Sequence, residues 1–207
     1  MKLYSTELSK LQVKKIPMQT RPLGLEGLFV IEPDVSSDDH GRYSYYYSAA
    51  GFSGVGAASH YVQEHASFYP LRHTVRGLHF QKPPQAQTKV VRVARGRIWD
   101  VCVDIRRDSP TYGHHAVVEL EGGDWRQLHV PPGFAHGFCT LEDNTEITFR
   151  LTADNNREYA GGLLWNDPVL GIDWPCGTQP AWVFPVDRQW PTLEALSSPF
   201  QHRRQET

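Results

Sequence analysis

The stretch that decides the fold begins with Arg76-Gly77-Leu78-His79-Phe80 and resumes at Lys89 as KVVRVARGRIWDVCVDI, which ends at Ile105. In this second part, apolar and polar side chains alternate on both sides of Gly96, a pattern typical of half-buried strands joined by a turn. The alternation predicts that His79 and Lys89 lie on adjoining strands. A histidine base and a fixed lysine cation suit the removal of a proton beside a ketone and the holding of the oxyanion that forms.

Length and composition favour a single domain. The chain has 207 residues, and 40% of them are hydrophobic, which is enough to build one core. The formal net charge is -2, and no basic run exceeds two residues, which argues against a nucleic-acid or membrane partner. The N-terminus lacks an apolar stretch of signal-peptide length, so we expect a cytoplasmic protein. Three widely spaced cysteines indicate reduced thiols rather than disulfides.

Short apolar segments separated by turn signals predict the remaining strands. Strands this short and this regularly interrupted indicate a jelly-roll or barrel. Near the C-terminal end, Pro191–Leu196 is a candidate for a short helix. The expected strands include a first strand at 24–31, an aromatic strand at 42–47, and strands at 116–120 and 125–130 joined by a Gly-Gly turn.

A series of longer motifs runs in order between roughly residues 22 and 191: Arg76-Gly77-Leu78-His79-Phe80-Gln81, Val103-Asp104-Ile105-Arg106, Asp108-Ser109-Pro110-Thr111, Pro132-Gly133-Phe134-Ala135-His136-Gly137-Phe138 and Trp165-Asn166-Asp167-Pro168. In this order they resemble the dTDP-4-dehydrorhamnose 3,5-epimerase family. The resemblance implies an all-β, RmlC-like cupin jelly-roll barrel with short helices at the C-terminal end. It implies one domain over 1–207, with a lead-in segment at 1–21 and a C-terminal tail at 192–207. It also implies an isomerase that acts on a nucleotide sugar.

The same resemblance implies that His79 is the catalytic base and that Asp187 assists it. A carboxylate bonded to the second ring nitrogen of a histidine fixes the tautomer and stabilises the imidazolium that forms. The residues alone leave two alternatives open. Asp187 could instead cap the short helix that follows it, and His79 could be a core histidine bonded to backbone.

Other positions match family residues that contact the substrate. Lys89 resembles the lysine at the substrate carbonyl, and Arg76 resembles the arginine at the diphosphate. A compact ammonium suits one enolate oxygen, whereas a planar guanidinium suits paired phosphate oxygens. His136, Gln63 and Tyr43 are further candidates for substrate contact, and the alternative for His136 is a structural histidine in a turn.

The chain departs from the family at several of these positions. Phe149 stands where the family has a tyrosine that protonates the opposite face of the enolate, and phenylalanine has no proton to give. We retain Phe149 as a substrate contact and expect epimerisation at one carbon, C3 or C5. Tyr159 is the nearest tyrosine in sequence. His65 replaces an asparagine near the sugar and is also a substrate-binding candidate, and Tyr45 replaces a glutamate that reads the base.

Partners and cofactors follow from the same comparison of motifs. In the family, the nucleotide-contacting strand comes from the partner subunit, so the resemblance implies a homodimer. We expect no metal or other cofactor, because cupin metal sites use His-x-His and the second position here is Gln81. His79 and His136 form an incomplete ligand set, even if His129 adds a third. Two alternative functions remain: a cupin isomerase or lyase with another carbonyl substrate, and a non-catalytic sugar-nucleotide-binding subunit.

Overall fold

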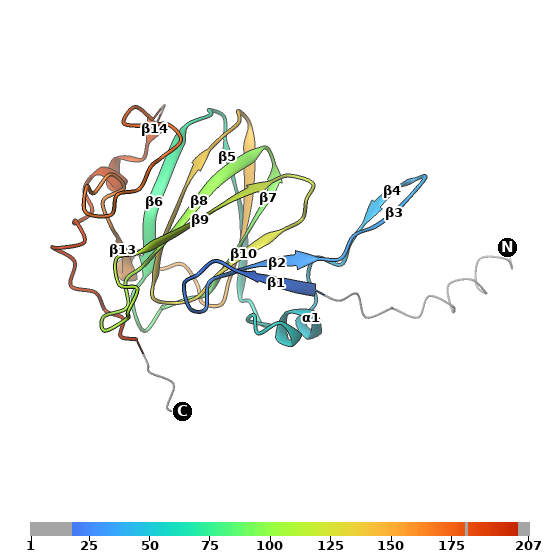
Figure 1. The fold of residues 1–207 in the computed structure, drawn as a ribbon, viewed down its shortest axis with the longest axis horizontal. Coiled ribbons are helices and arrows are strands. Elements are labelled where there is room, and N and C mark those ends of the chain that lie inside the picture. The colour runs from blue at the N-terminus through green and yellow to red at the C-terminus, as the bar shows by residue number, and fades with distance from the viewer. Residues whose placement is uncertain (1–17, 181, 203–207) are drawn as a thin grey trace, which may run out of the picture.

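Two sheets packed face to face make up the fold (Figure 1), as the computed structural model describes it for residues 18–180 and 182–202. The predicted all-β jelly-roll is thereby confirmed. The first sheet has the order β1 (Met18–Pro22), β2 (Phe29–Pro33), β10 (Gln127–Val130), β7 (Lys89–Arg95), β12 (Thr145–Leu151) and β5 (Gln63–Tyr69). The second has the order β13 (Ala160–Gly162), β6 (Thr74–Gln81), β11 (Phe134–Thr140), β8 (Arg97–Asp104) and β9 (His115–Glu121), and β14 (Trp182–Val183) pairs with β6.

The start of the described chain differs from the prediction. Met18–Pro22, which falls partly in the predicted lead-in, is strand β1 and pairs along its whole length with β2. Residues 1–17 of that lead-in lie outside the described residues. The strand predicted from residue 24 begins at Phe29, because the Leu28 N–H donates to the Leu25 carbonyl at 3.0 Å and closes a turn first.

The predicted aromatic strand at 42–47 is wrong beyond Tyr43. Only β4 (Gly41–Tyr43) forms there, and it pairs with β3 (Ser36–Asp38) in a hairpin that extends away from the two sheets (Figure 1). The side chain of Asp38 closes the hairpin turn by accepting the N–H of Gly41 at 3.0 Å. Helix α1 (Ala49–Gly54) then begins because the Ser48 hydroxyl accepts a backbone N–H of its first turn.

Of two further predictions, one is confirmed and one is wrong. The strands predicted on either side of the Gly-Gly turn exist as β9 and β10; β9 pairs with β8 and β10 pairs with β2 and β7, so the turn crosses between sheets. The helix predicted at 191–196 is wrong, because the Leu193 N–H donates to the Asp167 carboxylate at 2.6 Å instead of to a helical carbonyl. The short helices of this region are the 3-10 turns η2 (Arg157–Tyr159) and η3 (Pro185–Arg188).

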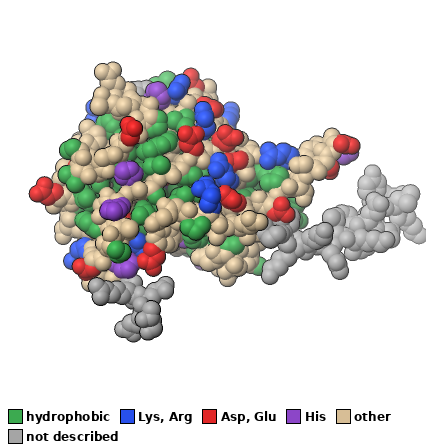
Figure 2. Space-filling view, viewed as in Figure 1, with side chains coloured by type: hydrophobic (Ala, Val, Ile, Leu, Met, Phe, Trp, Pro, Cys, Tyr) green, Lys and Arg blue, Asp and Glu red, His purple; other side chains and the backbone are tan. Residues whose placement is uncertain are grey.

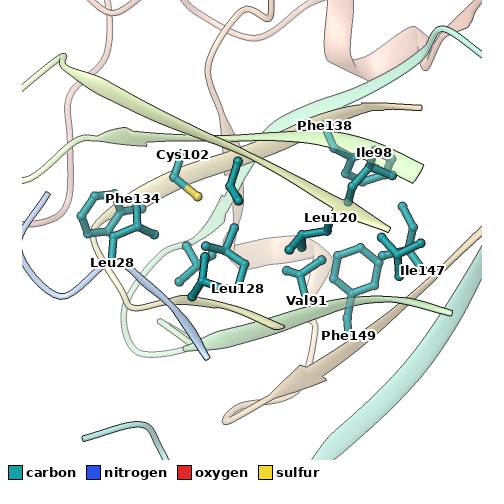
Figure 3. Close-up of a cluster of buried hydrophobic side chains, with 14 of the residues drawn as sticks. Leu28, Val91, Ile98, Cys102, Leu120, Leu128, Phe134, Phe138, Ile147 and Phe149 are labelled. Atoms are coloured by element: carbon teal, nitrogen blue, oxygen red, sulfur yellow. The ribbon is translucent and has the colours of Figure 1, made fainter. Parts of the chain in front are cut away.

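Both faces of the second sheet are hydrophobic and buried. Its inner face packs against the first sheet (Figure 3), where Phe138 and Phe149 come from opposite sheets. Its outer face is covered by the C-terminal segment, residues 163–180 and 182–200. This segment contributes Leu163, Trp174 and Phe200 to a second cluster. This cover holds the C-terminal segment against β6 (Figure 1). The segment therefore has a fixed position from which it can supply side chains to the sheet edge.

The surface and the cysteines agree with the composition. On the face drawn in Figure 2, acidic and basic side chains are interspersed, as the small net charge leads one to expect. Cys102, Cys139 and Cys176 are all free thiols. None of the helices in the described ranges has the length and apolar character that a membrane crossing needs.

A close backbone approach joins β6 to β11 beside the cavity. A Cβ on Gly137 would lie 2.5 Å from the Arg76 carbonyl oxygen and 2.9 Å from a methyl group of Leu78, so neither strand has room for it. We expect Gly137→Ala to lower the free energy of unfolding by about 1–3 kcal/mol, measured by urea denaturation. Gly54→Ala is the matched control, since its Cβ would meet no atom within 4 Å. Equal stability of the two variants would contradict this account of the contact.

Candidate active site

A cavity of about 850 Å³ opens between the two sheets. This volume falls in the range of ligand-binding pockets. Alternation along each strand turns every second side chain into it, as with His65, Ser67 and Tyr69 on β5. Six of the residues singled out from the sequence line this cavity: His65, Arg76, His79, Lys89, His136 and Phe149.

His79 and Asp187 form a hydrogen-bonded pair at the cavity wall. The Nε2 atom of His79 lies 2.5 Å from Oδ1 of Asp187, although the two residues are 108 positions apart in the chain. The other oxygen of Asp187 accepts the Gly77 N–H at 3.0 Å, and the side chain of Asp187 is fully buried. The alternative role of Asp187 as cap of a helix at 191–196 is wrong, because no helix forms there. His79 is bonded to a carboxylate through its side chain and faces the cavity.

The electrostatics of the pair suit a neutral histidine beside an ionised carboxylate. Burial, together with the charges of Lys89 and Arg76, lowers the pKa of His79 below its usual value, against the opposing hydrogen bond and charge of Asp187. Burial acts to raise the pKa of Asp187, but the bonds from His79 and Gly77 and the charge of Arg76 leave it below its usual value. At neutral pH, the free ring nitrogen of His79 is therefore available to accept a proton.

Lys89 comes from the opposite sheet and not from a strand that adjoins β6. The prediction of adjoining strands is wrong, because the loop after β6 crosses to the facing sheet before β7 begins. The two residues still meet across the cavity, where the Lys89 ammonium donates to the His79 carbonyl at 3.3 Å. Burial lowers the pKa of Lys89 to about 8, against the opposing charge of Asp100. The side chain is thus mainly charged at neutral pH.

Arg76 lies beside the same pair. Its Nε is 3.4 Å from Oδ2 of Asp187, and another guanidinium nitrogen is 3.4 Å from the Tyr69 hydroxyl. The guanidinium carbon lies 4.5 Å from the centre of the Phe184 ring. About a quarter of the side chain is exposed, so it is held in place yet open to a ligand.

A second histidine–carboxylate pair joins a lining residue of the cavity, His136, to Asp100, which does not line it. His136 Nε2 is 2.9 Å from the carboxylate of Asp100, and both residues are buried. His136 is part of strand β11, so the alternative of a structural histidine in a turn is wrong. Asp100 was not singled out as a site residue, although a carboxylate inside an apolar strand pattern was a signal for it. Burial raises the pKa of Asp100, opposed by His136 and Lys89.

The possible metal ligands do not gather around His79. His129, the suggested third ligand, stacks on Phe29 at 4.3 Å and its Nδ1 lies 3.2 Å from the Gly27 carbonyl. Within the described residues, the one close group of metal-ligand types is Asp100, Cys102 and His136, whose ligand atoms lie within 4.8 Å of one another. Lys89 places its own positive charge near this group. The residues present are therefore better suited to an ammonium than to a metal ion.

The remaining candidates occupy three different places. His65 and Phe149 lie side by side on the cavity wall, with ring centres 5.1 Å apart and planes at 18°. Gln63 lies beyond the lining and accepts the Asn155 N–H at 3.0 Å. Tyr43 is on the projecting hairpin with 54% of its surface exposed, so the structure does not bring it to this cavity. Tyr159 belongs to η2 and is not a lining residue.

Several lining residues were missed in the sequence. Trp190 follows η3 and its indole nitrogen is 3.4 Å from Oδ1 of Asp187. Arg157 and Asn156 enter from the segment that connects β12 to β13. Their only sequence signal was proximity to Asp187 or to β12, because an irregular segment has no periodicity that shows which way a side chain points.

Comparison with known proteins gives one consistent result. Residues 22–195 match the family model described as dTDP-4-dehydrorhamnose 3,5-epimerase. A dTDP-4-dehydrorhamnose 3,5-epimerase from Sinorhizobium fredii is 40% identical over 185 residues, 89% of this chain and 94% of that protein. The solved structure of RmlC from Legionella pneumophila, in complex with dTDP-4-keto-L-rhamnose, matches with a TM-score of 0.82 and 33% identity over 91% of this chain and 99% of that one.

A relative with a narrower reaction is also similar. The 3'-monoepimerase from Streptomyces bikiniensis, solved in complex with dTDP-quinovose, matches with a TM-score of 0.77 and 27% identity. The match covers 84% of this chain and 87% of that one. The same fold is therefore found in relatives named for epimerisation at two carbons and in one named for a single carbon.

Proposed function

Because the chain belongs to the dTDP-4-dehydrorhamnose 3,5-epimerase family, we propose that His79, assisted by Asp187, removes a proton beside the ketone of its substrate. The protein is an isomerase, a nucleotide-sugar epimerase for a 4-keto-6-deoxy sugar. The 2.5 Å contact between His79 and Asp187 at the cavity wall is the observation that carries the assignment of the base. A binding protein has no need of a buried carboxylate that orients a neutral histidine.

The proposed first step is enolisation. The free nitrogen of His79 takes the proton from the carbon next to the C4 ketone, and the imidazolium that forms is stabilised by Asp187. The ketone oxygen becomes an oxyanion, which the ammonium of Lys89 holds across the cavity. Both groups project into the same cavity, and the ammonium lies within 3.3 Å of the His79 backbone.

The proposed binding contacts lie around this centre. Arg76 meets the diphosphate, since its guanidinium is partly exposed and its orientation is set by Asp187 and Phe184. His136 contacts the sugar from β11, and the apolar ring of Phe149 covers one side of it. Gln63 contributes to binding indirectly: its side-chain oxygen accepts the Asn155 N–H, and Asn155 lines the cavity. We propose dTDP as the nucleotide, on the ground of the ligands named for the relatives.

A homodimer and a cytoplasmic location complete the proposal. The hairpin of β3 and β4 projects from the body of the fold (Figure 1). Tyr43, the last residue of β4, and Tyr45, two residues beyond it, are exposed. We propose that both tyrosines contact a nucleotide in a partner subunit. Free thiols at all three cysteines agree with a reducing compartment.

The test is proton NMR of dTDP-4-keto-6-deoxyglucose incubated with the protein in deuterium oxide. We expect the C–H signal at C3 or C5 to disappear as deuterium replaces the proton, together with a new stereoisomer at that carbon. Loss of both signals would show epimerisation at two carbons. If neither carbon exchanged in a folded protein that binds dTDP, the proposed reaction would be wrong.

A further inference from the structure

We propose that His65 is the general acid that returns a proton to the enolate on the face opposite His79. The inference rests on the proposed function, because it assigns the second proton transfer of the same reaction. Inversion requires that the new proton arrive from the side opposite the base. His79 projects from β6 in one sheet, and His65 projects from β5 in the facing sheet.

The position of His65 relative to Lys89 supports this role. Across the first sheet, His65 is paired with Phe149, which is paired with Val91, and the neighbouring row is Gln63, Leu151 and Lys89. In the sheet, the strand of Lys89 is therefore the second one over from the strand of His65, and Lys89 belongs to the next row of paired residues. Lys89 is the residue whose ammonium holds the oxyanion. Lys89 is also close enough to lower the pKa of His65 by its charge, after the larger effect of burial.

The ring of His65 is held in place but is not used by the protein itself. It stacks on Phe149, which fixes the plane of the ring. Its Nδ1 is enclosed and has no hydrogen-bond partner among residues 18–180 and 182–202. Leaving a buried polar atom unpaired is unfavourable. A histidine that is oriented, unpaired and at the cavity wall is more consistent with a ligand-directed group than with a structural one.

The other side chains on this wall are less suited to the task. Phe149 and Leu151 carry no acidic proton, and Lys89 is engaged with the oxyanion. Tyr69 is buried with its hydroxyl beside the Arg76 guanidinium, at the opposite end of β5 from Gln63. Within the described part of this wall, His65 is the one imidazole, and an imidazolium is a stronger acid than an ammonium or a phenol.

The proton balance closes without a cofactor. His79 accepts the substrate proton as the C–H bond breaks, and the electron pair moves into the enolate. Protonated His65 then donates its proton to the same carbon from the other face, forming the new C–H bond and restoring the ketone. Each turnover leaves His79 with one proton more and His65 with one fewer, and solvent exchange resets both after product release.

The experiment separates deprotonation from inversion. In deuterium oxide, NMR measures both the rate of C–H exchange and the fraction of exchange events that give the inverted sugar. We expect His65→Asn to lower that fraction by about 10²-fold or more while exchange through His79 continues. His65→Gln provides a second test should the first variant fold poorly, and dTDP binding measured by calorimetry checks that the cavity is intact.

A rescue variant tests for a proton donor at this wall. Phe149 is the cross-strand partner of His65, so the double variant His65→Asn with Phe149→Tyr places a phenol beside the position that lost the imidazole. We expect this double variant to regain inversion. If it exchanges protons but still fails to invert, a missing donor at this wall is not the defect, and the proposal is overturned.

The pH dependence adds a readout that a purely structural role would leave unchanged. Burial and Lys89 hold the pKa of His65 below its usual value, so in the wild type the inverted fraction should fall as pH rises through that pKa. In the double variant it should stay constant over the same range, because a phenol titrates at about 10. The charged and titratable groups that share the cavity with His65 are Lys89, Arg76, His79, His136, Tyr69 and Arg157.

The outcomes distinguish this proposal from the proposed function. Absence of exchange in the wild type would refute the epimerase reaction itself. Normal exchange and normal inversion in His65→Asn would refute only the role of His65, as would equal loss of both in a variant that still binds dTDP. Loss of inversion in Tyr69→Phe but not in His65→Asn would assign the acid to Tyr69 instead.

Discussion

Replacement of His79 by alanine is expected to lower the rate of C–H exchange beside the ketone by about 10²–10⁴-fold. The variant lacks the nitrogen that accepts the proton, while Asp187 keeps its bond to the Gly77 N–H and Arg76 remains to meet the diphosphate. Affinity for dTDP should therefore change little. Exchange is measured by NMR in deuterium oxide and affinity by calorimetry.

A matched histidine controls for this result. His115 lies on β9, at the far edge of the second sheet, and does not line the cavity. His115→Ala should exchange protons at the wild-type rate. An exchange rate in His79→Ala within a few-fold of that control would contradict the assignment of His79 as base.

The second large effect is expected for Lys89→Met. Methionine is similar in length but uncharged, so the oxyanion loses the cation that faces it, and exchange should slow by about 10²–10³-fold. Lys82→Met is the control, because Lys82 is exposed in the loop after β6 and lies outside the cavity lining. Equal exchange rates in the two variants would mean that another group stabilises the enolate.

The pH profile of exchange checks both assignments in the wild type. His79 must be neutral to act as base, and its pKa lies below the usual value, so exchange should rise with pH at the acid end, below about 6.5. Lys89 must be protonated, so exchange should fall as pH rises through about 8. In Lys89→Met the alkaline decline should be absent from the much slower residual exchange. A decline that persists at the same pH would have to come from a different group.

The sequence predicted where the strands of the site lie in the chain better than it predicted which strands pair with each other. Alternation around Gly96 correctly gave β7 and β8, and the motif around His79 gave β6. The same local pattern led to the wrong conclusion that His79 and Lys89 are on adjoining strands, because alternation carries no information about which sheet a strand joins. The aromatic run at 42–47 failed for a related reason: only its first residues find a partner strand, β3, and the pattern does not show where pairing ends.

The sequence by itself determined the all-β class and the alternation of side chains along strands such as β7, since the period of two is a local property of each strand. Only the tertiary structure decided which of those side chains meet. Asp187 reaches His79 across 108 residues because the C-terminal segment packs on the outer face of the second sheet, and no local pattern encodes that packing. The pairing of His65 with Phe149, on the wall opposite His79, was likewise decided by the long-range register of β5 and β12.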